Sequence, residues 1–391
     1  MGYGYPIGCR YPPKACPLYY VCSGRYGHRP TVMESLSTPS TRDLRLAARY
    51  SRQVLFPGIG AEGQQRLAAG HVAVVGCGAT GAAATALLAR AGVGTLTIID
   101  RDFVEESNLQ RQVLFDEADA GEALPKAEAA RRKIAAFNSE TRIHAHVNDL
   151  VPANIHELLA SSSIVLDATD NFETRYLLND YAVQQQKPWI YTAAVGAYAA
   201  TMNILPGPSE YQTACLACIF PSAPSGAVDT CDTAGILNTA VNLSASIAVT
   251  EVLKFLTGQQ HLMRRTLLSH DLWRNEHTEI AAGMPRKDCN VCGQRKFIHL
   301  AGEDRPQITL CGRNSVQIHE HNRPVDLNEM KLRLAPHGHV RANSLLLRLE
   351  LPVRNGTPGH TITLFPDGRA LIQGTTDVAL ARSLYARYIG S

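Results

Sequence analysis

The sequence predicts an α/β protein with a doubly wound, Rossmann-like parallel sheet, N-terminal helices and a small C-terminal α+β domain. Three observations lead to this fold class. Short apolar runs alternate with helical patterns between residues 71 and 256. The stretch VVGCGATG, at 74–81, has the glycine spacing of a strand that turns tightly into a helix. Beyond residue 294 the pattern changes to strands, a hairpin turn and a terminal helix.

The composition is that of an ordinary globular chain. Its 391 residues are enough for a large core, and 45% of them are hydrophobic while 19% are charged. The formal net charge of +3 is too small to indicate nucleic acid or a membrane surface as a partner. Because we find no run of 18 or more apolar residues, we expect no transmembrane helix.

The chain divides into three predicted parts. Residues 1–40 are rich in Tyr, Pro, Gly and Ser and lack periodicity, so we expect a disordered tail, and Met33 opens a plausible shorter chain. Residues 41–300 form the main domain, with helical spacing at 43–55 and 61–70. Strands are then predicted at 71–76, 95–100, 142–150, 163–169, 188–195 and 201–207, and helices after Gly78, from Pro125, at 155–160, at 179–186 and at about 238–256.

The third part, residues 305–391, is predicted to be a small separate α+β domain with the order β-α-β-β-α. Its helices are expected at 327–334 and 377–389. The Pro-Asp-Gly turn at 366–368 lies between two alternating runs, which is a strong hairpin signal. Since no cluster of chemically active residues stands in this part, its expected role is contact with a partner or support of a dimer.

The glycines at 76, 78 and 81 spell G-x-G-x-x-G, and Asp100 follows at the end of the next predicted strand. This is the fingerprint of a dinucleotide site, in which a helix N-terminus faces a phosphate and an acid contacts the ribose. Alone the motif is weak, because it also describes any tight strand-to-helix turn. Two functions stay open at this point: a bound NAD or FAD, or a nucleotide that the protein consumes.

The residues after Asp100 favour the consumed nucleotide. Asp102, Asn108, Arg111 and Gln112 come directly after the second predicted strand, where a NAD site needs only an acid and an ordinary helix. Guanidinium groups bind polyphosphate, so this polar cluster suits a nucleoside triphosphate. A dinucleotide-dependent oxidoreductase is the alternative, although we find no acid/base pair placed for hydride transfer.

Two further stretches carry residues suited to phosphate. Lys126 follows Pro125 at the start of a predicted helix, where amides and an ammonium attract phosphate; the alternative is a lysine that faces solvent. The stretch DATDNFETR ends another strand and carries Asp170, Asn171 and Arg175. Ligands of open α/β sheets bind beyond such strand ends, and a carboxylate there can hold Mg²⁺ against phosphate oxygens.

Four of the ten cysteines form two C-x-x-C pairs, Cys215 with Cys218 and Cys289 with Cys292. In an α/β enzyme such pairs indicate a metal rather than a disulfide framework, and they favour a cytoplasmic location. Four thiolates give a closed tetrahedral site, so we predict a structural Zn²⁺.

Together these motifs resemble the ThiF/MoeB/HesA enzymes, bacterial relatives of the ubiquitin-activating enzymes. The C-terminal segment looks like the extension of some ThiF-type members. Asn238 stands where we expected proline. The stretches that carry the resemblance occur in the family's order between about residues 45 and 294: RYSRQ, GCGATG, DRD with SNLQRQ, PKAE, DATDNFETR, CLAC, TCDTAG and CNVCG.

The resemblance implies a homodimer with two ATP sites. Such enzymes adenylate the C-terminal glycine of a ubiquitin-like sulfur-carrier protein that ends in Gly-Gly, for thiamine or molybdenum-cofactor sulfur transfer. Arg52 would reach into the partner subunit's site, and Asp170 would bind Mg²⁺. The implied nucleotide contacts are Gly76, Gly78 and Gly81 in the loop, Asp100 at the ribose, and Asn108, Arg111 and Lys126 at the polyphosphate.

Cys231 matches the family cysteine that forms a thioester or acyl-persulfide link with the carrier in some members. It precedes the long predicted helix, and a thiol near a helix N-terminus has a lowered pKa; the alternative is a packed cysteine without chemistry. A sulfurtransferase or a cysteine desulfurase is the candidate further partner. A non-catalytic binder of ubiquitin-like proteins is a third hypothesis, but Arg52, Arg111, Lys126 and Asp170 speak against it, because a binder needs no polyphosphate machinery.

Overall fold

The computed structural model describes residues 41–222, 234–302, 308–311, 315–318, 324–343, 345–352 and 359–390. The predicted tail at 1–40 and Cys231 lie outside the described residues. The chain divides into two compact units, with the boundary between Ala47 and Ala48. Two sheets belong to the larger unit, which begins at Ala48.

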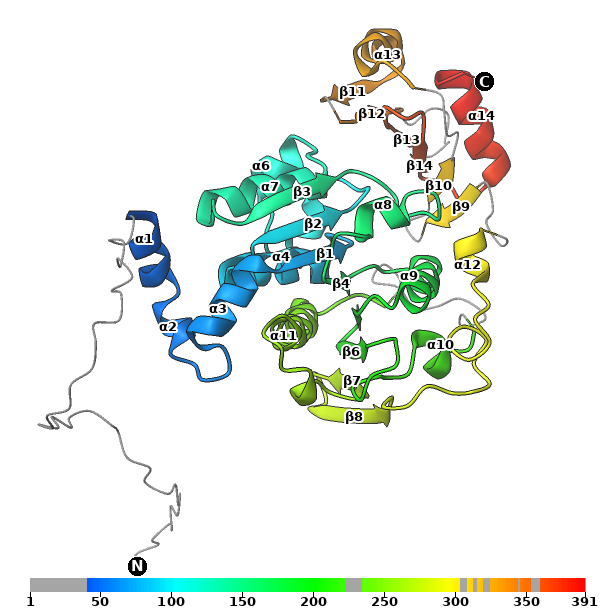
Figure 1. Cartoon of the computed structure of the whole chain (residues 1–391). Helices are drawn as coiled ribbons and strands as arrows, with labels where there is room; N and C mark the ends of the chain where they lie inside the picture. The colour runs from blue at the N-terminus through cyan, green and yellow to red at the C-terminus, as the bar shows by residue number, and fades with distance from the viewer. Residues whose placement is uncertain are drawn as a thin grey trace, which may run out of the picture. The chain divides into compact units, whose positions relative to one another are not determined.

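An eight-stranded sheet has the order β3-β2-β1-β4-β5-β6-β7-β8 (Figure 1). The strands from β3 to β5 pair in parallel. From β1 the chain passes to β2 and β3 and then returns to β4 on the other side of β1, so a topological switch point lies between β1 and β4. The strands are β1 (His71–Val75), β2 (Thr95–Ile99), β3 (Arg142–His146), β4 (Ile164–Asp167), β5 (Trp189–Val195), β6 (Tyr198–Ile204), β7 (Thr266–Asp271) and β8 (Glu276–Ala281).

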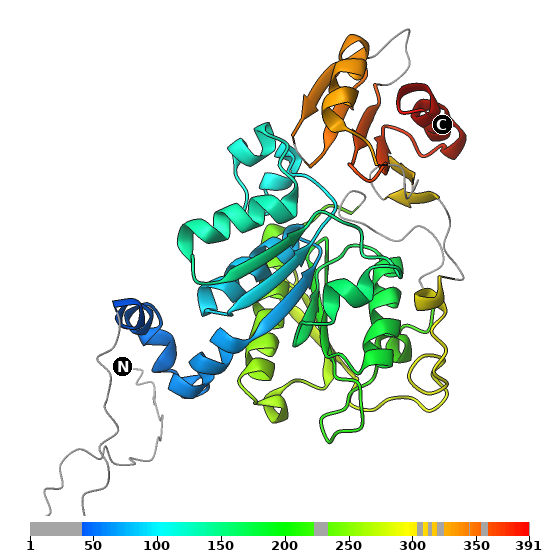
Figure 2. The same ribbon diagram turned by 45° about the horizontal axis from the view of Figure 1, so that its top comes forward.

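Helices cover both faces of this sheet (Figure 2). Successive side chains of a strand point to opposite faces, so Val72 and Val74 join one buried cluster while Ala73 and Val75 join another. The first cluster includes α4, α7 and α11, and the second includes α8, α9 and α10. The helices are α2 (Ser51–Val54), α3 (Gly60–Ala69), α4 (Ala79–Ala91), α5 (Glu106–Leu109), α6 (Glu117–Gly121), α7 (Lys126–Phe137), α8 (Ile155–Leu159), α9 (Phe172–Gln185), α10 (Leu216–Ile219), α11 (Asn238–Leu256) and α12 (Ile298–Ala301).

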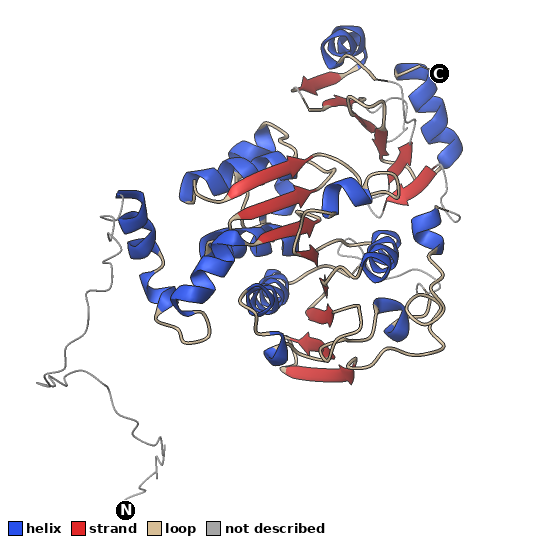
Figure 3. Cartoon of the chain, in the orientation of Figure 1, coloured by secondary structure: helices blue, strands red, loops and turns tan. Residues whose placement is uncertain are grey.

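The doubly wound α/β class is confirmed, but the sheet is not parallel throughout. Strands β6, β7 and β8 pair antiparallel, beginning with the β5–β6 hairpin (Figure 3). The turn of this hairpin includes Gly196, whose φ of +57° suits a residue without a side chain. The parallel half therefore carries the strand ends near the glycine loop, and the antiparallel half extends the sheet away from them.

The helical pattern at 43–55 is two helices, α1 (Thr41–Arg49) and α2, separated at Tyr50. The Tyr50 side chain is buried and its hydroxyl accepts a hydrogen bond from Asn138 Nδ2 at 3.1 Å. Asn138 follows α7, so this contact ties the start of α2 to the main sheet's helical layer.

Helix α11 has the length and mean hydropathy (1.3) of a membrane span, although polar residues interrupt its apolar run. In the structure it packs against α4, β5 and β6. Its buried Ala245, Ala248 and Val252 belong to the cluster on one face of the sheet. These apolar side chains of the helix therefore pack in the protein core.

Residues 308–390 contain a second, antiparallel sheet of six strands, with the order β11-β12-β13-β14-β10-β9. Helices α13 (Leu327–Leu334) and α14 (Val378–Tyr388) share a buried cluster with its strands. The predicted hairpin around Gly368 is confirmed as β13–β14, while β9 and β11 were not expected. The domain boundary near residue 300 stays a prediction. The strands are β9 (Ile308–Cys311), β10 (Ser315–Ile318), β11 (His339–Ala342), β12 (Leu347–Glu350), β13 (Thr361–Leu364) and β14 (Ala370–Gln373).

Candidate nucleotide site and cysteine cluster

The three motif glycines have different local roles. Gly76 has a φ of +85°, and a Cβ there would lie 2.7 Å from the carbonyl oxygen of Ala168. A Cβ on Gly81 would lie 1.9 Å from the carbonyl oxygen of Gly76. These two glycines let β1, β4 and α4 approach closely. At Gly78 a Cβ would meet only Gln112 Nε2, at 3.9 Å, so this residue keeps open the N-terminal end of α4, where anions bind.

Asp100 anchors the glycine loop to the segment that follows β2. Its Oδ2 accepts a hydrogen bond from Cys77 N at 2.6 Å, and its Oδ1 accepts one from Asp102 N at 2.7 Å. Burial raises the pKa of Asp100, while the charge of Lys126 acts in the opposite direction. The acid that the motif assigns to the ribose thus lies directly beside the glycine loop.

Lys126 is the first residue of α7 and is almost wholly buried, with 1% of its surface exposed. Its Nζ lies 3.1 Å from Asp102 Oδ2, and its backbone N–H donates to the carbonyl of Asp102 at 2.8 Å. The alternative of a solvent-facing lysine is therefore wrong. A buried ammonium is stable only with a partner, and Asp102 supplies one half-buried carboxylate.

Helix α5 and the turn after it bring Asn108, Arg111 and Gln112 to the same place. Asn108 and Gln112 are buried, yet Asn108 Oδ1 and Gln112 Oε1 have no hydrogen-bond partner. Arg111 is half-buried and donates to the carbonyl of Ser107 at 2.8 Å. Buried polar atoms are normally paired, so these two unpaired amide oxygens, with Gln112 next to Gly78, fit a site that a polar ligand completes.

The stretch after β4 places its three predicted residues differently. Asp170 is exposed, and Asn171 caps α9 by accepting from Thr174 N at 2.8 Å. Arg175 is buried: its Nε donates to Asp167 Oδ2 at 3.2 Å, and its Nη2 donates to the carbonyls of Thr169 and Thr192 at 2.6 and 2.9 Å. These contacts shape the loop that presents Asp170. Nucleotide contacts of Asn171 and Arg175 stay predictions.

Arg52 is exposed on α2. Among the described residues it has no hydrogen bond or ion pair, which leaves its guanidinium free for a ligand or a partner subunit. Asn238, found where proline was expected, begins α11, and its Nδ2 donates to the carbonyl of Gln110 at 3.2 Å. This link joins α11 to the turn between Asn108 and Arg111, so the departure from the family pattern supports the site.

The four cysteines of the C-x-x-C pairs come together although the pairs are 74 residues apart in sequence. All four Sγ atoms lie within 4.8 Å of one another. Cys215 Sγ is 3.8 Å from Cys218 Sγ and 3.6 Å from Cys289 Sγ, and Cys218 Sγ is 3.3 Å from Cys292 Sγ. Zinc–sulfur bonds of about 2.3 Å place tetrahedral thiolates about 3.8 Å apart, so this set fits a zinc ion.

Neighbouring groups hold the cysteine cluster in place. Asn179 on α9 accepts a hydrogen bond from Leu216 N at 2.8 Å, which fixes the start of α10. Arg286 N donates to Cys218 Sγ at 3.3 Å. Hydrogen bonds from Cys215, Cys292 and this amide lower the pKa of Cys218, so they favour the thiolate that binds metal.

Sequence reasoning missed the contacts that Arg101 and Asp149 make beside the site. Arg101 Nη1 donates to Asp149 Oδ1 at 2.8 Å and to Gln317 Oε1 at 2.6 Å. A charged residue between two acids of a D-x-D motif was a visible signal, but its partners lie 48 and 216 residues away.

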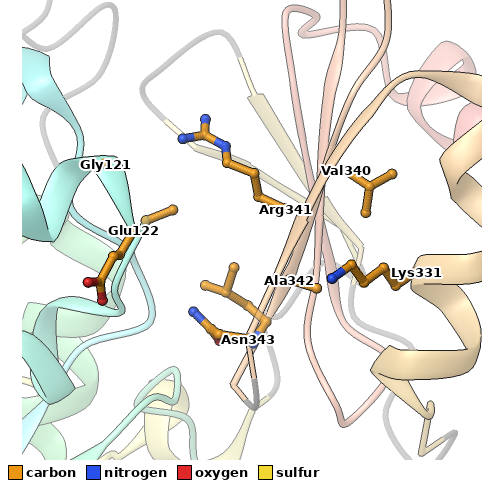
Figure 4. A pocket seen from close by; sticks show the side chains of 9 residues that line it. Gly121, Glu122, Lys331, Val340, Arg341, Ala342 and Asn343 are labelled. Carbon is orange, nitrogen blue, oxygen red and sulfur yellow. Dashed lines mark hydrogen bonds between the residues drawn. The ribbon is translucent and has the colours of Figure 1, made fainter.

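A cavity of about 260 Å³ lies between the end of α6 and the second sheet (Figure 4). The residues that line it come from both sides: Gly121, Glu122 and Ala123, and then Lys331, Val340, Arg341, Ala342, Asn343 and Leu346. None of the predicted nucleotide residues lines this cavity.

Comparison with known proteins gives a consistent result. The profile described as the ThiF family matches residues 50–291. A Bacillus subtilis protein named sulfur carrier protein ThiS adenylyltransferase is 42% identical over 349 residues, covering 88% of this chain and all of that protein. A Thermus thermophilus protein named sulfur carrier protein adenylyltransferase is 36% identical over 249 residues, covering 63% of this chain and 90% of that protein.

Among solved structures, E. coli MccB resembles the chain with a TM-score of 0.55 and 25% sequence identity. The match covers 63% of this chain and 73% of MccB. The fold of the main sheet and its helices is therefore shared with that protein.

Proposed function

Because the chain belongs to the ThiF family, we propose that it adenylates the C-terminal glycine of a ubiquitin-like sulfur-carrier protein that ends in Gly-Gly. The sulfur would pass to thiamine or to the molybdenum cofactor, and a sulfurtransferase or cysteine desulfurase would supply it. The names of the B. subtilis and T. thermophilus relatives support this activity.

The buried Lys126–Asp102 pair beside the glycine loop carries the proposal. A dinucleotide that stays bound needs an acid at the ribose, which Asp100 supplies, but it needs no buried ammonium. Burying Lys126 is unfavourable in itself, and besides its partner Asp102 and the nearby Asp100 a strongly negative ligand would stabilise this ammonium at the N-terminus of α7. A triphosphate is such a ligand.

In the proposed reaction a carboxylate oxygen of the terminal glycine attacks the α-phosphorus of ATP. The new carbon-bound oxygen–phosphorus bond forms as the bond from the α-phosphorus to the bridging β-oxygen breaks. The electron pair of the broken bond leaves with pyrophosphate. Lys126 and Arg111 stabilise the charge that grows on the leaving group, and the unpaired amide oxygens of Asn108 and Gln112 accept hydrogen bonds from donor groups of the nucleotide, which orients it.

The exposed carboxylate of Asp170 would hold Mg²⁺, which neutralises phosphate oxygens when bound. Asp170 stands at the carboxyl end of β4, across the switch point from the glycine loop after β1. Asn171 fixes the backbone on the C-terminal side of Asp170 through Thr174, and Arg175 fixes the Thr169 carbonyl on its N-terminal side. The loop after β4 thus keeps the Asp170 carboxylate at a defined position during the adenylation step.

We further propose a cytoplasmic homodimer in which Arg52 completes the partner subunit's ATP site. The exposure of Arg52 on α2 supports a role outside its own subunit. For the cysteine cluster we propose structural Zn²⁺, supported by the sulfur–sulfur spacing of the four thiols. With four protein ligands no position is left for a substrate.

Exchange of labelled pyrophosphate into ATP tests the function. With ATP, Mg²⁺ and a carrier that ends in Gly-Gly, the protein should catalyse exchange, because the acyl-adenylate forms reversibly. A carrier that lacks the terminal Gly-Gly is the control and should give none. Tight binding of NAD or FAD, together with no exchange for any carrier tried, would refute the proposal in favour of an oxidoreductase.

A further inference from the structure

The segment from Asp100 to Glu105 connects the nucleotide site with the second sheet. Phe103 forms an isolated antiparallel bridge with Pro125, and Arg101 Nε lies 3.8 Å from Asp102 Oδ1. Asp100 and Asp102 contact the glycine loop and Lys126. Arg101, Phe103 and Glu105, which alternate with them, all contact residues between 317 and 369.

Arg101 joins a buried polar network that crosses to the second sheet. Asp149 accepts from Arg101 Nη1 at 2.8 Å and from Arg369 Nη1 at 2.9 Å, and Gln317 contacts both Arg101 and Asp149. Arg369 is itself buried, with 3% of its side chain exposed, and its Nε donates to Asp367 at 2.6 Å. The carboxylate of Asp149 therefore lies between two guanidinium groups: that of Arg101, which follows β2 of the main sheet, and that of Arg369, which precedes β14 of the second sheet.

Phe103 and Glu105 add an apolar and a charged contact. Phe103 packs with Ala123, Leu346 and Phe365 in a buried cluster of its own. The Arg348 guanidinium lies 4.7 Å from the centre of the Phe103 ring, and its Nη1 lies 3.4 Å from Glu105 Oε1. Glu105 is the residue before α5, so this contact reaches the helix that carries Asn108.

The cavity described above borders this contact, because Ala123 and Leu346 belong to both its lining and the Phe103 cluster. Packing on that side is open. Within the described part of the chain, the network around Asp149 and the contacts of Phe103 and Glu105 join the two sheets.

We infer that the second sheet (β9 to β14) acts as a splint for the ATP site: its contacts with residues 101, 103 and 105 hold the backbone of this segment in place. Arg369 and Arg348 are then positioning residues for the nucleotide. They act on Asp100 and Asp102 through the residues between them, because a backbone held at 101, 103 and 105 fixes the direction of 100 and 102. A site held in its bound geometry binds more tightly, since ordering is not needed on binding. The inference rests on the proposed function for the identity of the nucleotide.

The splint lies outside the region that the family shares. The ThiF profile ends at residue 291, whereas the splint contacts come from residues 317–369. The match to the B. subtilis relative covers 88% of this chain, more than the profile spans. The second sheet is thus an addition to the domain that the ThiF profile matches.

Variants of the full chain test the inference. Arg369→Leu removes the contacts with Asp149 and Asp367. Arg348→Leu removes the contacts with Glu105, the Phe103 ring and Glu350. Arg333→Leu is the matched control, because Arg333 belongs to the same sheet region but donates to the carbonyls of Tyr388 and Ile389, away from the 100–105 segment. Arg369→Lys is the conservative variant, which keeps a charge that reaches one carboxylate.

Calorimetric titration with ATP, without a carrier, measures the effect directly. We expect the Kd for ATP to rise about tenfold in Arg369→Leu and in Arg348→Leu, to recover in part in Arg369→Lys, and to stay within about twofold in Arg333→Leu. In the exchange assay the KM for ATP should rise by the same factor, while the KM for the carrier and kcat at saturating ATP stay unchanged. Hydrogen exchange of the 100–105 segment should quicken in the two leucine variants and not in the control.

Two results would overturn the inference: an ATP affinity within twofold of wild type in both folded variants, or an equal loss in Arg333→Leu, which would mean a general effect on folding. If Arg369→Leu fails to fold, Arg348→Leu decides, because Arg348 is partly exposed. A wild type that binds ATP but exchanges no pyrophosphate with any carrier would refute the proposed function alone, and the binding comparison would still test the splint.

Discussion

Lys126 and Asp102 form an ion pair of 3.1 Å in which the lysine is almost wholly buried. The pair stands at the start of α7, where the helix amides add positive potential. Lys126→Met keeps most of the volume and removes the charge. We expect kcat for pyrophosphate exchange to fall by about 10²–10³-fold, the loss typical of a preorganised electrostatic contact.

The control for this change is Lys133→Met on the same helix, since Lys133 pairs with Asp116 and Asp119 instead. Its exchange rate should stay near that of wild type. Equal rates in Lys126→Met and wild type would show that the buried ammonium has a structural role only.

Arg52 is predicted to act across a dimer. Arg52→Ala and Asp170→Ala should each be inactive, but a mixture should regain about a quarter to a half of the activity, because a mixed dimer has one site with both lesions and one with neither. The measurement is exchange activity of the mixture after subunit exchange, which differently tagged chains report. No recovery after confirmed subunit exchange would place Arg52 at its own subunit's site or outside catalysis.

Metal analysis tests the cysteine cluster. Freshly prepared, reduced protein should contain about one zinc ion per chain, and Cys292→Ser should lower both zinc content and melting temperature, because structural zinc contributes directly to folding. The control variant Cys311→Ser leaves all four cysteines of the cluster in place and should change neither. If wild-type protein freed of zinc melts at the same temperature as the protein before zinc removal, the assignment of a structural zinc site is contradicted.

Cys231 is predicted to separate two chemical steps. Cys231→Ser should keep carrier-dependent pyrophosphate exchange, since a thiol takes no part in the attack of a carboxylate on ATP. It should lose any covalent enzyme–carrier species that a reductant cleaves, which non-reducing electrophoresis and mass spectrometry detect. If wild type forms no such species, Cys231 is not the acceptor.

Asp180 should make stability depend on pH. Burial raises its pKa to about 6 from the ordinary value of 3.8, although the backbone amides of His299 and Leu300 donate to it. The folded state therefore holds this proton more tightly than the unfolded state, so its contribution to stability is present below about pH 4 and is lost as the pH rises to about 6. Asp180→Asn should flatten this part of the melting-temperature profile between pH 4 and 7, whereas parallel profiles of the two proteins would contradict the prediction.

The glycine loop and the cysteine cluster were predictable because local chemistry determines both. Only glycine tolerates the contacts at positions 76 and 81, and two C-x-x-C pairs allow few arrangements other than a metal site. Strand β8 was missed because it lies exposed along its whole length, so EHTEIA shows no apolar alternation. Apolar residues recur periodically in a strand only when one of its faces is buried, so an exposed edge strand shows no such periodicity.

The partners of Arg175 and Arg101 were not predictable from the sequence. A guanidinium suits phosphate and carboxylate equally, so the pattern DATDNFETR does not reveal that Arg175 on α9 pairs with Asp167 at the end of β4. Arg101 pairs with residues 48 and 216 positions away, and only the folded chain brings them together. Long-range ion pairs of this kind need the tertiary structure.

The separation of the two C-x-x-C pairs has a consequence for how the protein is made. Cys215 and Cys218 leave the ribosome 74 residues before their partners, and α11, β7 and β8 lie between them. During that interval only two of the cluster's four thiols are available, so the first pair is exposed to oxidation and to loosely held metal until synthesis passes residue 292. The supply of zinc during translation, rather than after it, should therefore govern the yield of correctly folded chains.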